Sequence, residues 1–128
     1  MNLFGNEIYD GRYYGGTSMR LGIVGMLPGD FRAFQPAQMQ AIRDLGFTGF
    51  GFHLDGHDVF AITAEDCAGY RGFMAGEDLG LAQFAITYNE CLFVVDPAPR
   101  ERVIAKIQRA TEIAAQLGAQ SFLLRPGS

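Results

Sequence analysis

Two histidines with aspartates beside them form a short stretch whose residue types suit metal binding. His53 and His57 lie four residues apart, with Asp55 between them and Asp58 directly after. Imidazole nitrogens and carboxylate oxygens are common ligands of Zn²⁺ and similar divalent ions. An i, i+4 pair suits two ligands on one helical face, whereas this stretch follows an apolar run that favours a strand. His53 and His57 are therefore metal candidates, with two alternatives open: His53 orients a substrate or satisfies backbone groups, and His57 is solvated.

Further polar residues that suit ligand binding follow two later apolar runs. Tyr88 and Asn89 carry hydroxyl and amide groups that can hydrogen-bond a polyol. Glu90 is a candidate general base, with a solvated surface carboxylate as the alternative. Arg125 ends the last apolar run, and its guanidinium offers a bidentate fork to a phosphate or carboxylate unless it forms an ion pair. Together these residues suit a polyol or a phosphate-bearing ligand.

A recurring Leu-Gly junction indicates the elements that must position these residues. Leu-Gly pairs at 45–46, 79–80 and 117–118 each precede a short run rich in aromatic and aliphatic residues. Their spacing is typical of a repeat architecture. Glycine suits the left-handed position just past a helix, so each pair predicts a helix that ends and a strand that begins. With the apolar run after Met19, the junctions predict strands near 21–26, 48–54, 81–88 and 120–125.

Helix-start signals stand in each interval between these strands. Pro36 opens the first helix, and Thr63 with Asp66 resembles a capping box for the second, expected over roughly 64–79. Asp96 and Pro97 open the third helix. Its expected apolar stripe consists of Val103, Ile104, Ile107, Thr111, Ala114 and Leu117. The element order is therefore β-α-β-α-β-α-β.

This alternation indicates an α/β fold with parallel strands joined by right-handed crossovers. Two architectures fit it, a partial TIM barrel and a small doubly wound open sheet. The first strand is followed by neither a GxGxxG nor a GxxxxGK[ST] loop. The sequence therefore lacks the nucleotide-binding motif that would favour an open, doubly wound sheet. We therefore expect residues 19–128 to form half of a TIM barrel, with residues 1–18 as an N-terminal tail or cover.

The barrel interpretation also predicts where the candidate residues gather and what the edges do. Active sites of TIM barrels lie at the C-terminal ends of the strands, and these are the positions that the candidate residues follow. Four strands are half of the eight that close a barrel. The first and last strands are then unpaired edges, which invite association. The sequence thus predicts either a homo-oligomer that pairs edge to edge or a missing C-terminal half.

Charge and composition narrow the classes of partner. A net charge of −4 gives no electrostatic footprint for DNA or RNA. No run approaches the roughly 18 consecutive apolar residues that span a bilayer, and no secretory signal pattern stands at the N-terminus. Cys67 and Cys91 belong to no CxxC pair and fit a reducing compartment. We expect a cytoplasmic domain without nucleic-acid or membrane partners.

Five segments carry a family resemblance. They are residues 19–28 (Met-Arg-Leu-Gly-Ile-Val-Gly-Met-Leu-Pro), 45–49 (Leu-Gly-Phe-Thr-Gly), 52–54 (Phe-His-Leu), 117–119 (Leu-Gly-Ala) and 124–128 (Leu-Arg-Pro-Gly-Ser). In this order and spacing they resemble the sugar phosphate isomerase/epimerase family of xylose-isomerase-like TIM barrels. The resemblance implies a metal-dependent isomerase or epimerase of a small sugar or sugar phosphate, in which Mn, Mg, Co or Zn polarises the substrate oxygens.

The same resemblance implies roles at the strand ends for His53 and Arg125. The Glu, Asp, His and Glu metal ligands of the family come from strands later than those of this chain. The chain is therefore expected to be the N-terminal portion of such an enzyme and incomplete as a catalyst on its own.

Two other interpretations stay open. One is a non-catalytic truncated α/β domain that self-associates or binds a small ligand. The other is an apurinic-endonuclease-like protein, since those related barrels use early-strand histidines for zinc. The acidic net charge disfavours DNA binding and hence this last interpretation.

Overall fold

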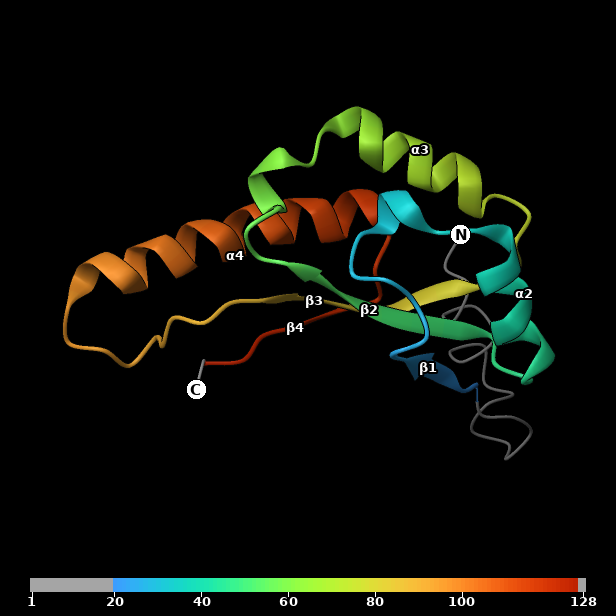
Figure 1. Cartoon of the computed structure of the whole chain (residues 1–128), viewed down its shortest axis with the longest axis horizontal. Coiled ribbons are helices and arrows are strands. Elements are labelled where there is room, and N and C mark those ends of the chain that lie inside the picture. Colours follow the sequence, from blue (N-terminus) through green and yellow to red (C-terminus); the bar gives the residue numbers. More distant parts are fainter. Residues whose placement is uncertain (1–19, 127–128) are drawn as a thin grey trace, which may run out of the picture.

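A computed structural model describes residues 20–126 of the chain, in which four strands alternate with three α-helices (Figure 1). The strands are β1 (Gly22–Val24), β2 (Gly49–Asp55), β3 (Gly80–Thr87) and β4 (Ser121–Leu123). The helices are α2 (Pro36–Asp44), α3 (Ala64–Met74) and α4 (Pro97–Leu117), with short 3-10 turns η2 (Phe31–Ala33) and η3 (Val59–Ala61). The predicted segment 1–18 lies outside the described residues. Within residues 20–126, no helix has the length and apolar character to cross a bilayer.

The four strands form one parallel sheet in the order β1-β2-β3-β4. Phe52 pairs with Phe84, and Phe84 pairs in turn with Phe122, so one aromatic row crosses three strands. Each strand therefore lies beside the next strand along the chain, without the reversal of order found in doubly wound sheets. β1 and β4 are the two edges, as the sequence predicts.

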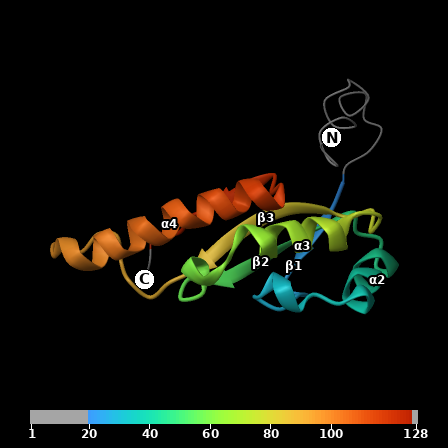
Figure 2. The same cartoon turned by 90° about the horizontal axis from the view of Figure 1, so that it is seen from above.

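All three helices pack on the same face of this sheet. Met39 and Ile42 of α2, Cys67 of α3 and Ile113 of α4 belong to one buried cluster with Phe84. Figure 1 and Figure 2 together show α3 and α4 running alongside the strands on a common side of the sheet. A doubly wound sheet carries helices on both faces, whereas a TIM barrel carries them only outside. The structure is thus an α/β fold of four parallel strands of the kind that forms part of a TIM barrel.

Aromatic residues dominate the core between sheet and helices. The ring of Phe52 lies 5.1 Å from that of Phe34 and 5.2 Å from that of Phe84, both in edge-to-face geometry. Such pairs contribute about 0.5–1.5 kcal/mol each beyond the area that they bury. Phe84 is fully buried and also contacts Phe122, with ring centroids 5.8 Å apart. This core fixes the register of β2, β3 and β4, and with it the side chains that reach the strand ends.

The opposite face of the sheet carries small and polar residues. Successive side chains along a strand point to opposite faces of the sheet, so the residue after each buried aromatic residue lies on the other face. His53 pairs with Ala85, and Ala85 pairs with Leu123. Gln83 lies on this face between Gly51 and Ser121. This is the face that lines the interior when such a sheet closes into a barrel.

Three helix starts agree with the sequence prediction. The Thr63 hydroxyl accepts a hydrogen bond from the Asp66 amide at 3.1 Å, and the Asp66 carboxylate accepts one from the Thr63 amide at 2.9 Å, which completes the capping box. The Asp96 carboxylate accepts from the Ala98 amide at 3.1 Å at the start of α4, and α2 begins at Pro36 as predicted. Gly46 and Gly118 follow their helices with φ of +87° and +74°, as the Leu-Gly junctions predict.

The second helix is shorter than predicted. α3 ends at Met74, whereas the sequence interpretation carried it to about residue 79. Gly76 (φ +87°) and Asp78 (φ +56°) both adopt left-handed conformations, which terminate the helix and turn the chain toward β3. Gly80 is consequently the first residue of β3 and not a helix cap, so the middle Leu-Gly junction differs from the other two.

The buried face of α4 is also rotated from the predicted stripe. Ile104 is 41% exposed, and Thr111 is exposed as well, although both stood in the predicted stripe. Ala110 and Ile113 are fully buried in their place. The small Ala110 allows close approach to η3 and the core, a feature that a pattern based on large apolar residues overlooks.

Candidate functional site

The C-terminal ends of β2 and β3 are held together by backbone contacts. The amide of Gly56, the residue after β2, donates to the carbonyl oxygen of Thr87 at the end of β3, with an N–O distance of 2.8 Å. The Asp55 carboxylate accepts from the His57 amide at 2.9 Å, and the Asp58 amide donates to the Asp55 carbonyl at 2.9 Å. The Asp55 side chain is therefore used to shape the turn that follows β2.

The two histidines lie in different surroundings. His53 is half-buried on β2, on the sheet face that carries Gln83 and Ala85. His57 is exposed in the turn beyond the strand. In residues 20–126, no group of three or more His, Cys, Asp or Glu side chains lies close enough together to hold a metal ion. The described part of the chain thus supplies no complete ligand set of these residue types.

Tyr88 and Arg125 lie side by side at the ends of β3 and β4. The Tyr88 hydroxyl is buried, and no group within residues 20–126 makes a hydrogen bond of full geometry to it. Burial raises the pKa of Tyr88, and the charge and backbone amide of the neighbouring Arg125 oppose this shift in part. Tyr88 packs against the hydrophobic core, whereas Arg125 is exposed. The Arg125 guanidinium is therefore the group of this pair that faces solvent and that a ligand can reach.

Glu90 forms an ion pair that the sequence interpretation did not contain. The Lys106 Nζ of α4 lies 3.0 Å from the Glu90 Oε1, and the two side chains are only 12% and 20% exposed. The hydrogen bond from Lys106 lowers the pKa of Glu90. A carboxylate of lowered pKa is a weaker base, so this environment favours an anchoring role over general base catalysis. No sequence pattern links the two residues, because only the return of α4 along the sheet brings Lys106 to this loop.

The loop that carries Asn89 and Glu90 also connects to the end of β4. The Leu92 amide donates to the Pro126 carbonyl at 2.8 Å. Asn89 is exposed beside Tyr88. Four candidate residues therefore lie at the C-terminal ends of β3 and β4: Tyr88, Asn89, Glu90 and Arg125. His53 lies on β2, on the face of the sheet opposite the helices. We refer to these five residues as the rim site.

A second charged pair lies in the loop after β1. The Arg32 guanidinium contacts the Asp30 carboxylate, with an Nε–Oδ1 distance of 2.9 Å. This hydrogen bond lowers the pKa of Asp30 and raises the pKa of Arg32. Asp30 also accepts from the Arg32 amide and so begins η2. The pair therefore orders the first loop at the same end of the sheet.

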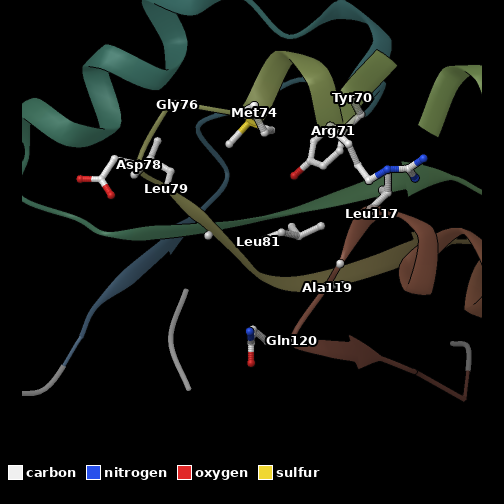
Figure 3. Close-up of a pocket in the computed structure, with 13 residues that line it drawn as sticks. Tyr70, Arg71, Met74, Gly76, Asp78, Leu79, Leu81, Leu117, Ala119 and Gln120 are labelled. Atoms are coloured by element: carbon white, nitrogen blue, oxygen red, sulfur yellow. The ribbon is translucent and has the colours of Figure 1, made fainter. Parts of the chain in front are cut away.

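A wide cleft lies at the other end of the sheet. Its volume is about 850 Å³, and it opens between the ends of α3 and α4 over the start of β3 (Figure 3). Tyr70, Met74, Asp78 and Leu117 are among the residues that line it. None of the predicted site residues takes part. In TIM barrels this N-terminal end serves stability and the C-terminal end serves chemistry, so we place the candidate site at the rim and not in the cleft.

The fold is similar to that of a sugar epimerase. No family model and no curated protein matches the sequence. Among solved structures, the chain is similar to D-psicose 3-epimerase in the presence of D-fructose, with a TM-score of 0.60 and 19% sequence identity. The similarity covers 81% of this chain and 36% of that chain, so the chain spans little more than a third of the epimerase. The fold of this chain is thus similar to that of part of this epimerase.

Proposed function

We propose that the rim site binds a small sugar or sugar phosphate, as the N-terminal portion of a metal-dependent sugar isomerase or epimerase. The observation that carries this proposal is the exposed Arg125 guanidinium at the C-terminal end of β4, with Tyr88 beside it at the end of β3. They lie at the strand ends where TIM barrels bind substrates. The similarity in fold to D-psicose 3-epimerase supports a sugar as the ligand class.

Each rim residue has a role that follows from its position. Tyr88 lies beside Arg125 and offers its hydroxyl to a sugar hydroxyl. Arg125 offers its guanidinium fork to a phosphate group. Asn89 and His53 supply further donors and acceptors to hydroxyl groups. Glu90 anchors its loop through Lys106 and keeps these groups in place.

The metal of this proposal requires ligands from outside the described residues. Within residues 20–126 the acidic and histidine side chains form no group able to hold an ion. A divalent ion such as Mn, Mg, Co or Zn, once bound by a complete barrel, would polarise the oxygens of the substrate. The part played by this chain is to bind and orient the sugar.

Titration with D-fructose and with D-fructose 6-phosphate, followed by NMR and calorimetry, tests the proposal. A charge-assisted hydrogen bond contributes about 1.5–3 kcal/mol. Arg125→Ala should therefore weaken binding of the phosphate ester by about tenfold or more and change binding of fructose little. Tyr88→Phe should weaken both ligands by several-fold.

Arg102→Ala is the matched control, because Arg102 is an exposed arginine on α4 and is not one of the rim-site residues. This variant should bind both ligands like the native chain. The proposal is wrong if the native chain binds neither ligand, with or without the divalent ions named above. It is also wrong if Arg125→Ala and Arg102→Ala weaken phosphate binding equally.

A further inference from the structure

The two edges of the sheet match in direction, and their strands match in length. β1 (Gly22–Val24) and β4 (Ser121–Leu123) have three residues each, and each pairs with a single neighbour within the described residues. All pairs are parallel, so the two edge strands point the same way. An edge strand presents unpaired backbone N–H and C=O groups to any strand that can lie beside it. Each edge of one copy is thus a suitable partner for the other edge of a second copy.

Exposed apolar side chains concentrate at these same edges. Leu21 and Val24 at β1 are 58% and 48% exposed, and Leu123 and Leu124 at β4 are 38% and 49% exposed. They are four of the nine large hydrophobic side chains exposed in residues 20–126, although the edges are a small part of the chain. Exposed apolar side chains beside unpaired backbone groups favour the pairing of each edge with another strand.

We propose that two copies of this chain pair edge to edge and close an eight-stranded parallel barrel. β4 of each copy lies beside β1 of the other, and a two-fold axis along the barrel makes both seams identical. The helices all lie on one face, which stays outside, and the face with His53, Gln83 and Ser121 becomes the interior. Closure removes every sheet edge, which no open arrangement of the four strands achieves.

The barrel geometry also predicts the register of the seam. An eight-stranded barrel of this type has a shear of about 8 residues, so each copy contributes about four. Across the sheet, Val24 is in line with Gly51, Gln83 and Ser121. Ser121 then faces the position four residues before Val24 in the second copy, which places Phe122 beside Leu21 and Leu124 beside Ile23. An even displacement keeps outward residues beside outward residues, so Leu21 and Leu124 both enter the seam.

This inference rests on the fold and the exposed edges and does not depend on which ligand the rim site binds. It does bear on that site, because in the pair a second copy takes the place of the C-terminal half that the proposed function expects and supplies the walls that β1 and β4 lack. The mass in solution tests the assembly, and sugar titration tests the ligand, so either proposal can fail while the other stands.

Size-exclusion chromatography with light scattering on the native chain is the first experiment. The expected mass is twice the 14.0 kDa of one chain, without larger species. Leu21→Asp and Leu123→Asp each introduce a charge into both seams, the first beside Phe122 and the second beside Gly22 of the other copy, and should give folded monomers. Val95→Asp is the matched control, since Val95 is 95% exposed outside the edges, and this variant should remain a dimer.

Three outcomes overturn the proposal. If the native chain is monomeric and folded by circular dichroism, a second copy is not the partner of these edges. The same conclusion follows if the edges pair only with downstream strands of a longer polypeptide. A dimer that survives both edge variants uses another surface. A series of growing oligomers indicates edge pairing that does not close.

Chemical cross-linking tests the register independently of the edge variants. Neighbouring strands lie about 4.8 Å apart and rise about 3.3 Å per residue, so Leu21 and Leu124 of opposite copies have Cα atoms about 8 Å apart in the predicted seam. Leu21→Cys with Leu124→Cys, in a chain that also carries Cys91→Ser, should give a covalent dimer with a short bis-maleimide. Leu21→Cys with Val95→Cys should give none, and a dimer that the first pair fails to cross-link contradicts this seam.

Discussion

Gly56 is the position where one added methyl group should separate the strands that form the rim site. Its amide donates to the Thr87 carbonyl oxygen at 2.8 Å, and the residue is buried between the ends of β2 and β3. A Cβ at Gly56 would overlap that same carbonyl oxygen. Because the obstacle is backbone, it cannot rotate away, and Gly56→Ala must push the two strand ends apart.

The expected cost follows from these contacts. Moving the strands breaks or lengthens the Gly56–Thr87 hydrogen bond, which contributes about 0.5–1.5 kcal/mol. Forcing extra volume into a packed site costs about 1–3 kcal/mol more. Gly56→Ala should therefore lower the free energy of unfolding by about 1.5–4.5 kcal/mol.

Gly69→Ala is the matched control with the opposite expected sign. Gly69 lies inside α3, and a Cβ there meets no atom within 4 Å. Alanine is favoured over glycine in a helix interior by about 0.5–1 kcal/mol, so this variant should be more stable than the native chain. The same chemical change is thus destabilising at the strand end and stabilising in the helix.

Urea unfolding followed by circular dichroism, at one protein concentration for all three proteins, measures both differences. The slope with urea should stay unchanged, because neither variant alters the surface that unfolding exposes. The reasoning is refuted if Gly56→Ala unfolds within about 0.5 kcal/mol of the native chain, a range ordinary for surface substitutions. It is also refuted if Gly69→Ala is destabilised as much as Gly56→Ala.

Two further predictions concern α3 and the ion pair of the rim site. Thr63→Ala removes the hydroxyl that accepts from Asp66 and should cost about 1 kcal/mol of unfolding free energy in urea, whereas a loss near zero would contradict the capping box. Lys106 lowers the pKa of Glu90 in the folded chain, so the pair stabilises the fold above the ordinary glutamate pKa of about 4.3 and loses this contribution as pH falls below it. Lys106→Met should lower the free energy of unfolding by about 1 kcal/mol at pH 7 and flatten its decline between pH 5 and 3. If the variant loses stability with falling pH as the native chain does, the Lys106–Glu90 pair is not the cause of that decline.

The order of elements was predictable because several local signals agree at each boundary. Pro36, Thr63 and Asp96 each mark a helix start, and the left-handed Gly46 and Gly118 mark two helix ends. Parallel pairing then follows from the alternation of strands and helices. Where the signals conflict, as between Met74 and Gly80, the predicted boundary was wrong. Asp78 takes a left-handed conformation there. Aspartate can adopt this conformation, but its presence in a sequence does not predict it.

The rim site was predictable in its place but not in its contacts. Strand ends are visible in the sequence, so Tyr88, Asn89 and Arg125 were assigned to one edge. The partner of Glu90 was not visible, because Lys106 is carried to it by a helix whose rotation depends on the packing of Ala110 and Ile113. The cleft between α3 and α4 was also unforeseen, since it results from the early end of α3.

Barrel closure by two copies should affect sugar binding at the rim site, because an open sheet leaves a bound sugar partly exposed to water. Hydrogen bonds and ion pairs strengthen when water is excluded, so closing the barrel should raise the affinity of Tyr88 and Arg125 for a sugar phosphate. Leu21→Asp should then weaken sugar binding although Leu21 lies at the β1 edge and is not one of the rim-site residues, whereas Arg125→Ala should weaken binding without changing the mass in solution. If Leu21→Asp gives a monomer that binds the sugar phosphate as the native dimer does, the site is complete within one copy. In that case closure serves only to cover the exposed edges of β1 and β4.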